Sequence, residues 1–321
     1  MLKLLNPIES IDTSIKKDII INHIMKSKGV YLLVSNPKVG KSMLALQLSC
    51  SVTNGMPFLG YKVNPSPVLY ITTESDSGQL RERLEFMELE PKKGSLFPID
   101  RQNKINISLR DLELEIKTFS EENNGRLIII DMLKDIDFGI EYDINNYQDI
   151  AQKVLPKLRY YCDKYNVTFL VTHHLNKNGK TLGSVALDAT VDGRITLIEN
   201  KTNLKYIKLQ TINRDFPSLD IQLKKLDNLI FKKINSIEED ELSYEMTSFI
   251  KYVASQKELD FTCTEIVLKA NIQMSPKRFG RLLNNSIELL ESEGVHIIKN
   301  RTSDTRSYHA VFVEPSQNED E

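Results

Sequence analysis

An eight-residue stretch, SNPKVGKS at positions 35–42, constrains this chain more than any other feature. It follows an apolar run at 29–35 and precedes an amphipathic stretch at 42–53. A loop between a buried strand and the start of a helix directs backbone N–H groups and the positive end of the helix towards an anion. The strand–loop–helix context therefore predicts a phosphate-binding loop.

Residue types in this loop suit a nucleoside triphosphate. Gly40 allows the backbone to approach the phosphates closely, the Lys41 ammonium suits the β- and γ-phosphates of ATP, and the Ser42 hydroxyl suits Mg²⁺. Ser35 stands where the usual pattern has its first glycine. The residues expected to line the nucleotide site are Ser35, Asn36, Pro37, Lys38, Val39, Gly40, Lys41, Ser42 and Met43.

Apolar runs alternate with amphipathic stretches across the ATPase domain expected at 28–234. Strands are expected at 29–35, 67–74, 126–133 and 167–174, and helices at 42–53, 78–87, 109–121 and 147–165. The strands are apolar through their length, which is typical of a parallel sheet covered on both faces. Later runs at 193–199, 205–212 and 229–234 are expected to extend it in antiparallel fashion. The pattern predicts a doubly wound α/β domain.

Two acidic residues end neighbouring apolar runs. Asp131 ends LIIID, and parallel strands end at a common sheet edge, so we expect its carboxylate beside the phosphate loop as a water-mediated Mg²⁺ ligand. The next residue is Met132, so the acid that orients the attacking water is expected to be Glu74. Either carboxylate could instead cap a helix. An acid after the second strand, rather than after Asp131, is typical of RecA-type ATPases.

Composition narrows the class of protein. With 40% hydrophobic and 27% charged residues, the chain reads as globular. We expect a cytoplasmic protein without membrane contact, because the sequence lacks an apolar run of about 18 residues and a signal-peptide pattern. The spacing of Cys50, Cys162 and Cys263 argues against a zinc site or disulfide framework. A net charge of −2 argues against extensive wrapping of duplex DNA.

A second domain is expected after an acidic linker at 235–242. Residues 1–27 are expected to pack on or link to the ATPase core, and 315–321 to form a disordered tail. Helices at 244–256, 263–270 and 275–293, followed by a hairpin at 295–314, predict a winged-helix domain over 243–314. Its recognition helix and wing would offer phosphate contacts from Lys277, Arg278, Arg281, Lys299, Arg301 and Arg306. Such domains bind proteins as well as DNA, and both remain open.

Four motifs together resemble the RepA/DnaB-type branch of the RecA-like ATPases, which includes hexameric helicases of plasmids and phages. They are KGVYLLVSNPKVGKSMLALQLS, GMPFLGYKVNPSPVLYITTE, LIIIDML and VTHHLNK, in this order. The resemblance implies a homo-oligomeric, hexameric ring that uses ATP and Mg²⁺ at subunit interfaces and translocates on single-stranded DNA. A replication-initiation protein or another phage or plasmid protein would contact the winged helix.

The resemblance also assigns roles at the end of the fourth strand. His174 would sense the γ-phosphate, with His173 as the alternative, and 176–190 would form a loop in the central channel. In that loop Lys177, Lys180, Gly183 and Ser184 would contact DNA or allow motion, although relatives often carry Arg where this chain has Leu182.

Arg214 occupies the position of the arginine finger that reaches into a neighbouring subunit's site in such rings. Relatives sometimes carry a Lys two residues earlier, where this chain has Ile212. A surface salt bridge with Asp215 is the alternative role for Arg214.

Three functions fit these observations. The first is a hexameric DNA helicase for replication of a plasmid, phage or other mobile element. The second is a RecA-like regulator or loader that switches assemblies without unwinding DNA. The third is a non-catalytic nucleotide-binding scaffold with a DNA-reading winged helix, which Glu74 and Asp131 disfavour because such a scaffold needs no hydrolytic acids.

Overall fold

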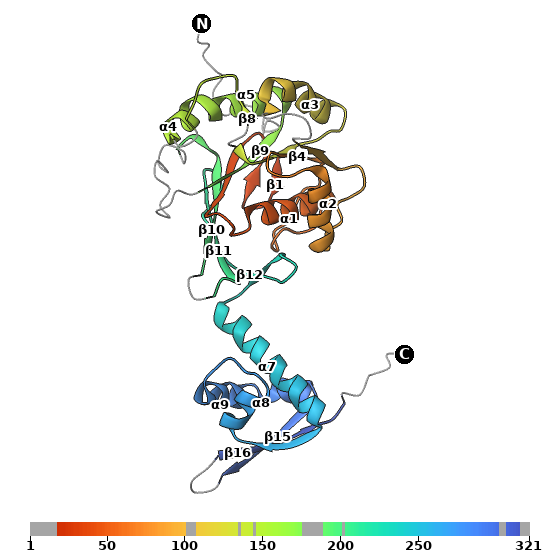
Figure 1. Cartoon of the computed structure of the whole chain (residues 1–321), viewed down its shortest axis with the longest axis vertical. Coiled ribbons are helices and arrows are strands. Elements are labelled where there is room, and N and C mark those ends of the chain that lie inside the picture. Colours follow the sequence, from red (N-terminus) through yellow and green to blue (C-terminus); the bar gives the residue numbers. More distant parts are fainter. Residues whose placement is uncertain are drawn as a thin grey trace, which may run out of the picture. The chain divides into compact units, whose positions relative to one another are not determined.

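The computed structural model describes residues 18–100, 107–133, 136–143, 146–174, 189–200, 203–301 and 306–314. The chain divides into two compact units, Met1–Ile234 and Asn235–Glu321, which are described separately (Figure 1).

A nine-stranded sheet forms the centre of the first unit, in the order β13-β12-β11-β10-β3-β9-β7-β4-β5. Its parallel part consists of β10 (Gly193–Glu199), β3 (Val30–Ser35), β9 (Thr168–His174), β7 (Leu127–Asp131), β4 (Val68–Thr72) and β5 (Leu96–Ile99). The antiparallel part consists of β11 (Tyr206–Asn213), β12 (Asp220–Lys225) and β13 (Phe231–Ile234). The expected α/β class, with a mostly parallel sheet extended at one edge, is confirmed.

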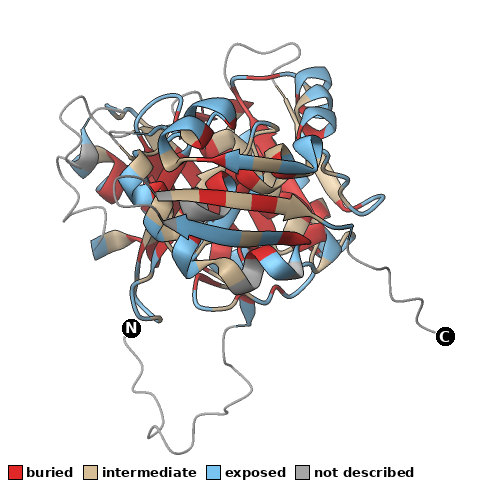
Figure 2. Cartoon of the chain, turned by 90° about the horizontal axis from the view of Figure 1, so that it is seen from below, coloured by how far each residue is buried: buried red, intermediate tan, exposed pale blue. Residues whose placement is uncertain are grey.

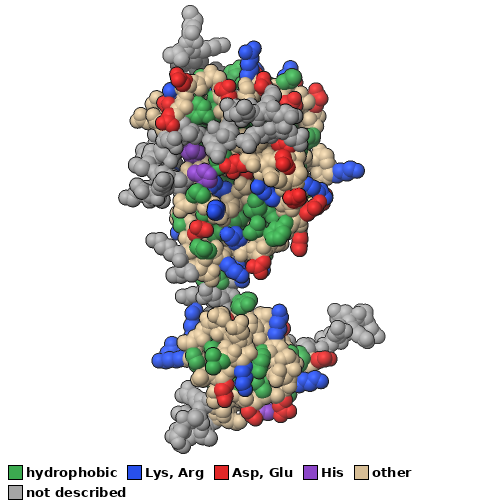
Figure 3. Space-filling view, viewed as in Figure 1, with side chains coloured by type: hydrophobic (Ala, Val, Ile, Leu, Met, Phe, Trp, Pro, Cys, Tyr) green, Lys and Arg blue, Asp and Glu red, His purple; other side chains and the backbone are tan. Residues whose placement is uncertain are grey.

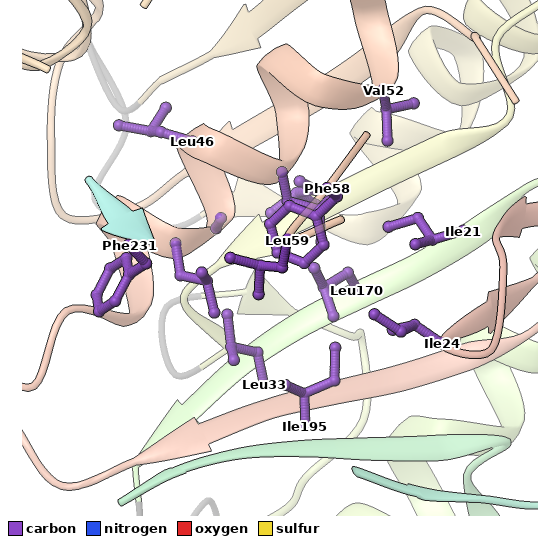
Figure 4. Close-up of a cluster of buried hydrophobic side chains, with 14 of the residues drawn as sticks. Ile21, Ile24, Leu33, Leu46, Val52, Phe58, Leu59, Leu170, Ile195 and Phe231 are labelled. Carbon is purple, nitrogen blue, oxygen red and sulfur yellow. The ribbon is translucent and has the colours of Figure 1, made fainter. Parts of the chain in front are cut away.

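Helices cover both faces of this sheet. Helices α1 (Lys41–Asn54) and α2 (Ser77–Phe86) contribute to one buried cluster. Leu46 and Val52 of α1 are labelled among its side chains in Figure 4. Helices α3 (Leu109–Glu121) and α5 (Leu155–Tyr165), the latter preceded by α4 (Tyr147–Asp149) and the π-helical turn Ile150–Val154, contribute to a second. Strand β3 serves both, since Leu33 lies in the first cluster and Leu32 in the second. Figure 2 shows buried residues gathered in the interior and exposed residues on the outside.

Several short or polar strands were not expected from the sequence. Strand β12 reads DIQLKK, in which only two apolar residues alternate with polar ones, so it carries a weak strand pattern. The other unexpected pairs are β1 (Ile19–Ile21) with β2 (Met25–Lys26), and β6 (Ile107–Ser108) with β8 (Ile136–Asp137). Strands of two or three residues are too short to show a period.

The second unit packs helices on a three-stranded antiparallel sheet. Its elements are α7 (Ile237–Gln256), β14 (Glu258–Phe261), α8 (Cys263–Lys269), α9 (Pro276–Asn285), α10 (Ile287–Ser292), β15 (Val295–Arg301) and β16 (Arg306–Phe312), with the strand order β14-β16-β15. Phe249, Phe261 and Phe279 meet in its own core.

Three features of this unit differ from the sequence-based expectation. Helix α7 begins at Ile237, inside the stretch expected as a linker, and strand β14 was not expected. The single helix expected over 275–293 is broken at Ser286. The break follows two asparagines, and the Asn284 side chain donates to the Gly280 carbonyl, the kind of side chain–backbone bond that weakens a helix interior.

Among the described residues, no helix is long and apolar enough to span a bilayer. Acidic and basic side chains intermix over the face seen in Figure 3.

Candidate nucleotide site

Parallel strand order brings the expected site residues to one edge of the sheet. Strand β9 lies between β3 and β7, and β4 follows β7, so all four strands end at this edge. In the strand register Ser35 pairs with His174, and Thr72 pairs with Asp131. The phosphate loop, both histidines, Asp131 and the residue that follows Thr73 therefore share this edge.

Lys41 is buried at the centre of this edge, with 6% of its surface exposed. Its Nζ lies 3.2 Å from the Ser35 carbonyl, 3.1 Å from Ser35 Oγ, 3.3 Å from the Asn36 carbonyl and 3.0 Å from His174 Nδ1. An ammonium group can only donate, so His174 Nδ1 accepts and the imidazole carries its proton on Nε2. Burial lowers the Lys41 pKa to about 8, while the nearby charges of Asp131 and Glu74 act in the opposite direction.

The structure explains why two positions of the loop carry the residues they do. Gly40 adopts φ 120°, which strains any other residue, and a Cβ there would lie 2.7 Å from Phe231 Cζ. Ser35, which replaces the usual first glycine, is fully buried. Its hydroxyl donates to the Asn36 carbonyl at 2.7 Å and accepts from Lys41, so this serine contributes to the lysine's binding site.

Asp131 is held by two buried hydroxyl groups. Its Oδ2 accepts from the Tyr70 hydroxyl and its Oδ1 from the Thr172 hydroxyl, both at 2.8 Å. Burial and the Asp131 charge raise the Tyr70 pKa well above its usual range, so the phenol stays a donor. Tyr70 and Thr172 were missed by sequence reasoning. Each sits inside an apolar run, where a single sequence does not separate it from an ordinary core residue.

Thr73 joins the ends of β4 and β7. Its hydroxyl accepts from the Met132 N–H at 3.0 Å and donates to the Met132 carbonyl at 3.2 Å. Its own N–H donates to the Asp131 carbonyl at 2.9 Å. These bonds fix the backbone next to Glu74, which is exposed beyond the end of β4.

The two histidines end β9 between the phosphate loop and Asp131, and both are half-buried. Burial is the largest cause that lowers the His173 pKa to about 4, and the neighbouring His174 and Lys41 act in the same direction. His173 is therefore neutral near pH 7. His174 is the histidine that contacts Lys41 directly.

The oxygen ligands at this edge fit Mg²⁺ bound together with a nucleotide. A Mg²⁺ ion in such sites uses one or two protein oxygens and takes its other ligands from phosphates and water. Ser42 lies in the first turn of α1, and Asp131 presents an oriented carboxylate. Within the described ranges, no cluster of three or more His, Cys, Asp or Glu side chains could hold a metal by itself.

Arg214 lies at the other end of the strands from the phosphate loop. It follows Asn213, which pairs with Gly193, and Gly193 pairs with Tyr31 near the start of β3. Tyr31 and Ser35 are four residues apart, so about 13 Å of strand separates Arg214 from the phosphate loop. Its guanidinium donates to the Ala189 carbonyl at 3.1 Å and lies 3.8 Å from the Asp192 carboxylate, with 54% of the side chain exposed.

The ion pair considered between Arg214 and Asp215 is not the contact observed. Asp215 instead pairs with Lys26, at 3.5 Å. Asp192 also pairs with Arg159 and accepts from the Val30 N–H at 2.8 Å, so Arg214 contacts a carboxylate that is already fixed in the core.

The structure describes only part of the expected nucleic-acid surface. Lys177, Lys180, Gly183 and Ser184 lie outside the described residues. Lys277, Arg278 and Arg281 are exposed on α9, while Phe279 and Leu283 of the same helix are buried. Lys299 is exposed on β15. Arg301 and Arg306 pair at the end of the hairpin, and their side chains are outside the description.

Comparison with known proteins places the chain in a family. The family model described as an AAA domain, AAA_25, matches residues 8–180, more than half of the chain. The matched region contains the phosphate loop, Glu74, Asp131 and both histidines of β9. No curated protein matches.

Two solved structures are similar. A KaiC-like protein from the archaeon Pyrococcus horikoshii OT3 is 16% identical, with a TM-score of 0.46 over 68% of this chain and 98% of that one. A DnaB-like replicative helicase, whose structure is described together with its interactions with primase, is 13% identical. Its TM-score is 0.52 over 65% of this chain and 58% of the helicase chain, so this chain spans less than two thirds of that protein and shares its fold.

The family match covers the loop and acids that the geometry brings together, and the helicase match supplies the architecture that holds them. The chain belongs to the AAA_25 family of AAA domains, and its first unit is a P-loop NTPase domain of the RecA-like fold.

Proposed function

We propose that this protein is an ATP-dependent motor of the RepA/DnaB type, which acts as a hexameric helicase on single-stranded DNA during replication of a plasmid, phage or other mobile element. One observation carries the proposal. Lys41, Glu74 and Asp131 gather at one sheet edge, whereas Arg214 lies at the other, about 13 Å away along the strands. A site that includes the arginine therefore requires a second copy of the chain.

Lys41 is prepared to bind phosphate. Its ammonium is bound by the carbonyls of its own loop, and these neutral acceptors are weaker partners than phosphate oxygens. ATP would replace them, and its negative charge would raise the Lys41 pKa back from about 8. Ser42 and Asp131 would hold Mg²⁺, which neutralises charge developing on the phosphates.

Glu74 is proposed to orient and deprotonate the attacking water. Its exposure leaves the carboxylate accessible to solvent at the nucleotide edge, and the Thr73 hydrogen bonds fix its backbone relative to Asp131. This supports a role in hydrolysis, because a base must be positioned to within a hydrogen bond of its water.

His174 is proposed to report the presence of the γ-phosphate. In this structure its Nδ1 accepts from Lys41. When Lys41 turns to a phosphate, the imidazole loses this donor and can form a different hydrogen bond. Such an exchange would connect nucleotide binding to the segment that follows β9, and His173 remains the alternative sensor.

The second unit is proposed to be a winged-helix domain, with α9 as the recognition helix and β15–β16 as the wing. Helices followed by a hairpin support this assignment, as do the exposed Lys277, Arg278 and Arg281. These side chains suit contacts with DNA phosphates, and a partner protein is the alternative.

Strand displacement on forked DNA, measured alongside ATP turnover and native mass, tests the proposal. Lys41→Ala should abolish turnover, and Glu74→Gln should bind ATP without hydrolysing it. Arg214→Ala subunits mixed with wild type should reduce turnover more than in proportion to their share. DNA-stimulated turnover without strand displacement would instead indicate a regulator or loader, and linear loss with Arg214→Ala would contradict a shared site.

A further inference from the structure

The phosphate loop rests on a side chain from the last strand of the first unit. The ring of Phe231, at the start of β13, is buried against the loop, and its Cζ lies 2.7 Å from where a Cβ on Gly40 would be. Phe231 lies at one end of the cluster shown in Figure 4, away from Phe58. The ring therefore occupies the space into which Gly40 would otherwise move.

Helix α1 holds the backbone of Phe231 through one side chain. The Gln47 amide donates to the Phe231 carbonyl at 2.8 Å and accepts from the Phe231 N–H at 2.9 Å. Gln47 thus satisfies both backbone groups, as a neighbouring strand would. Lys41 begins the same helix. Strand β13 therefore contacts Gly40 in the phosphate loop through the Phe231 ring, and Gln47 in the helix through the Phe231 backbone.

Sheet order makes this contact unexpected. Strand β13 is four strands away from β3, which carries the loop, and four strand spacings amount to about 19 Å. The contact therefore requires the antiparallel part of the sheet to curl towards α1, in keeping with the twist of sheets. The edge strand β13 thus contacts the loop that follows the distant strand β3.

We propose that Phe231 and Gln47 are positioning residues of the nucleotide site, which hold the phosphate loop in the shape that binds ATP. The inference rests on the proposed nucleotide site. Neither residue touches the reacting atoms, so both act on affinity rather than on hydrolysis. A loop held in its binding conformation before the ligand arrives loses less entropy on binding.

Phe231→Tyr tests the contact, because it adds one oxygen at Cζ, the atom that faces Gly40. Phe58→Tyr is the matched control, since Phe58 has the same 1% exposure in the same cluster. Both variants bury a hydroxyl, but only the hydroxyl of Phe231→Tyr would be pushed against the phosphate loop. We expect the Kd for a fluorescent ATP analogue and the KM for ATP to rise about tenfold in Phe231→Tyr, with kcat at saturating ATP close to wild type. Phe58→Tyr should leave the Kd for the analogue and the KM for ATP unchanged.

Gln47→Met provides a second test in case Phe231→Tyr does not fold. It keeps the side-chain length and removes both hydrogen bonds to Phe231. Its control is Gln210→Met, which removes a side-chain bond to Asp220 between β11 and β12. Gln47→Met should raise the KM for ATP several-fold, whereas Gln210→Met should not.

The outcomes separate this inference from the proposed function. If wild type binds the analogue no better than Lys41→Ala, the nucleotide site itself is wrong. If wild type binds it and the folded Phe231→Tyr and Gln47→Met variants bind equally well, the positioning role is wrong. A fall in kcat with an unchanged KM would also overturn it, because that result places the residues in the chemical step.

Discussion

Replacing Lys41 with methionine should stabilise the nucleotide-free protein while it abolishes nucleotide binding. Burial lowers the Lys41 pKa from 10.5 to about 8, and that difference corresponds to about 3 kcal/mol against the charged form in the folded state. Methionine keeps the length of the side chain without the charge. It forfeits the hydrogen bonds of Nζ to Ser35, Asn36 and His174, a net loss of about 1–2 kcal/mol. The free energy of unfolding at pH 7 should therefore rise by about 1–2 kcal/mol.

The pH dependence of the difference in unfolding free energy between wild type and Lys41→Met reports on the Lys41 charge alone. Between pH 8 and 10.5 the unfolded chain binds more protons at Lys41 than the folded protein does, so the lysine's penalty disappears as the pH rises. Other groups titrate in this range, but they are common to both proteins. The stability advantage of Lys41→Met should therefore shrink between pH 7 and pH 10.

Guanidinium unfolding followed by circular dichroism suits this measurement, because the chain has no tryptophan. Wild type should gain stability with Mg²⁺ and ATP, and Lys41→Met should not. A variant less stable than wild type at pH 7, or an advantage that persists at pH 10, would refute the reasoning about the buried charge. Stabilisation of the variant by ATP would refute the site.

Three further predictions follow from neighbouring contacts. The His173 pKa lies near 4 instead of 6.5, so wild type should lose up to about 3 kcal/mol of stability between pH 6.5 and pH 4. His173→Gln should lack this loss in an acid titration. Tyr70→Phe removes one of two hydroxyl bonds to Asp131, so unfolding measurements should show a loss of about 1–2 kcal/mol and ATPase assays a reduced kcat. Gly40→Ala combines a strained φ with a contact against Phe231, so titration with a fluorescent ATP analogue should show no binding, and unchanged affinity would contradict the packing.

The parallel part of the sheet could be predicted because its strands are apolar throughout and its loops carry chemical motifs. Asp131 and Glu74 could be placed by one rule, that parallel strands end at a common edge. With the observed strand order, in which β9 lies between β3 and β7, the same rule places His173 and His174 between the phosphate loop and Asp131.

The contacts that support the site could not be predicted, because they depend on which strands become neighbours. Thr172 reaches Asp131 across the β7–β9 pair, and Tyr70 reaches it from β4. Phe231 reaches Gly40 from four strands away. A local pattern carries no information about such pairings. The break in the helix expected over 275–293 was signalled by Asn284, Asn285 and Ser286, but an apolar period on either side outweighed these residues.

The junction after β13 also has a mechanical consequence. Strand β13 ends at Ile234 and α7 begins at Ile237, so only Asn235 and Ser236 join them. Two residues span about 7 Å and leave almost no slack. Tension on the second unit would reach β13 directly, and an edge strand can peel from its single neighbour one pair of bonds at a time. Phe231 would be the last residue of the strand to be reached, so a nucleotide should dissociate faster under load, as force spectroscopy with a labelled nucleotide would measure.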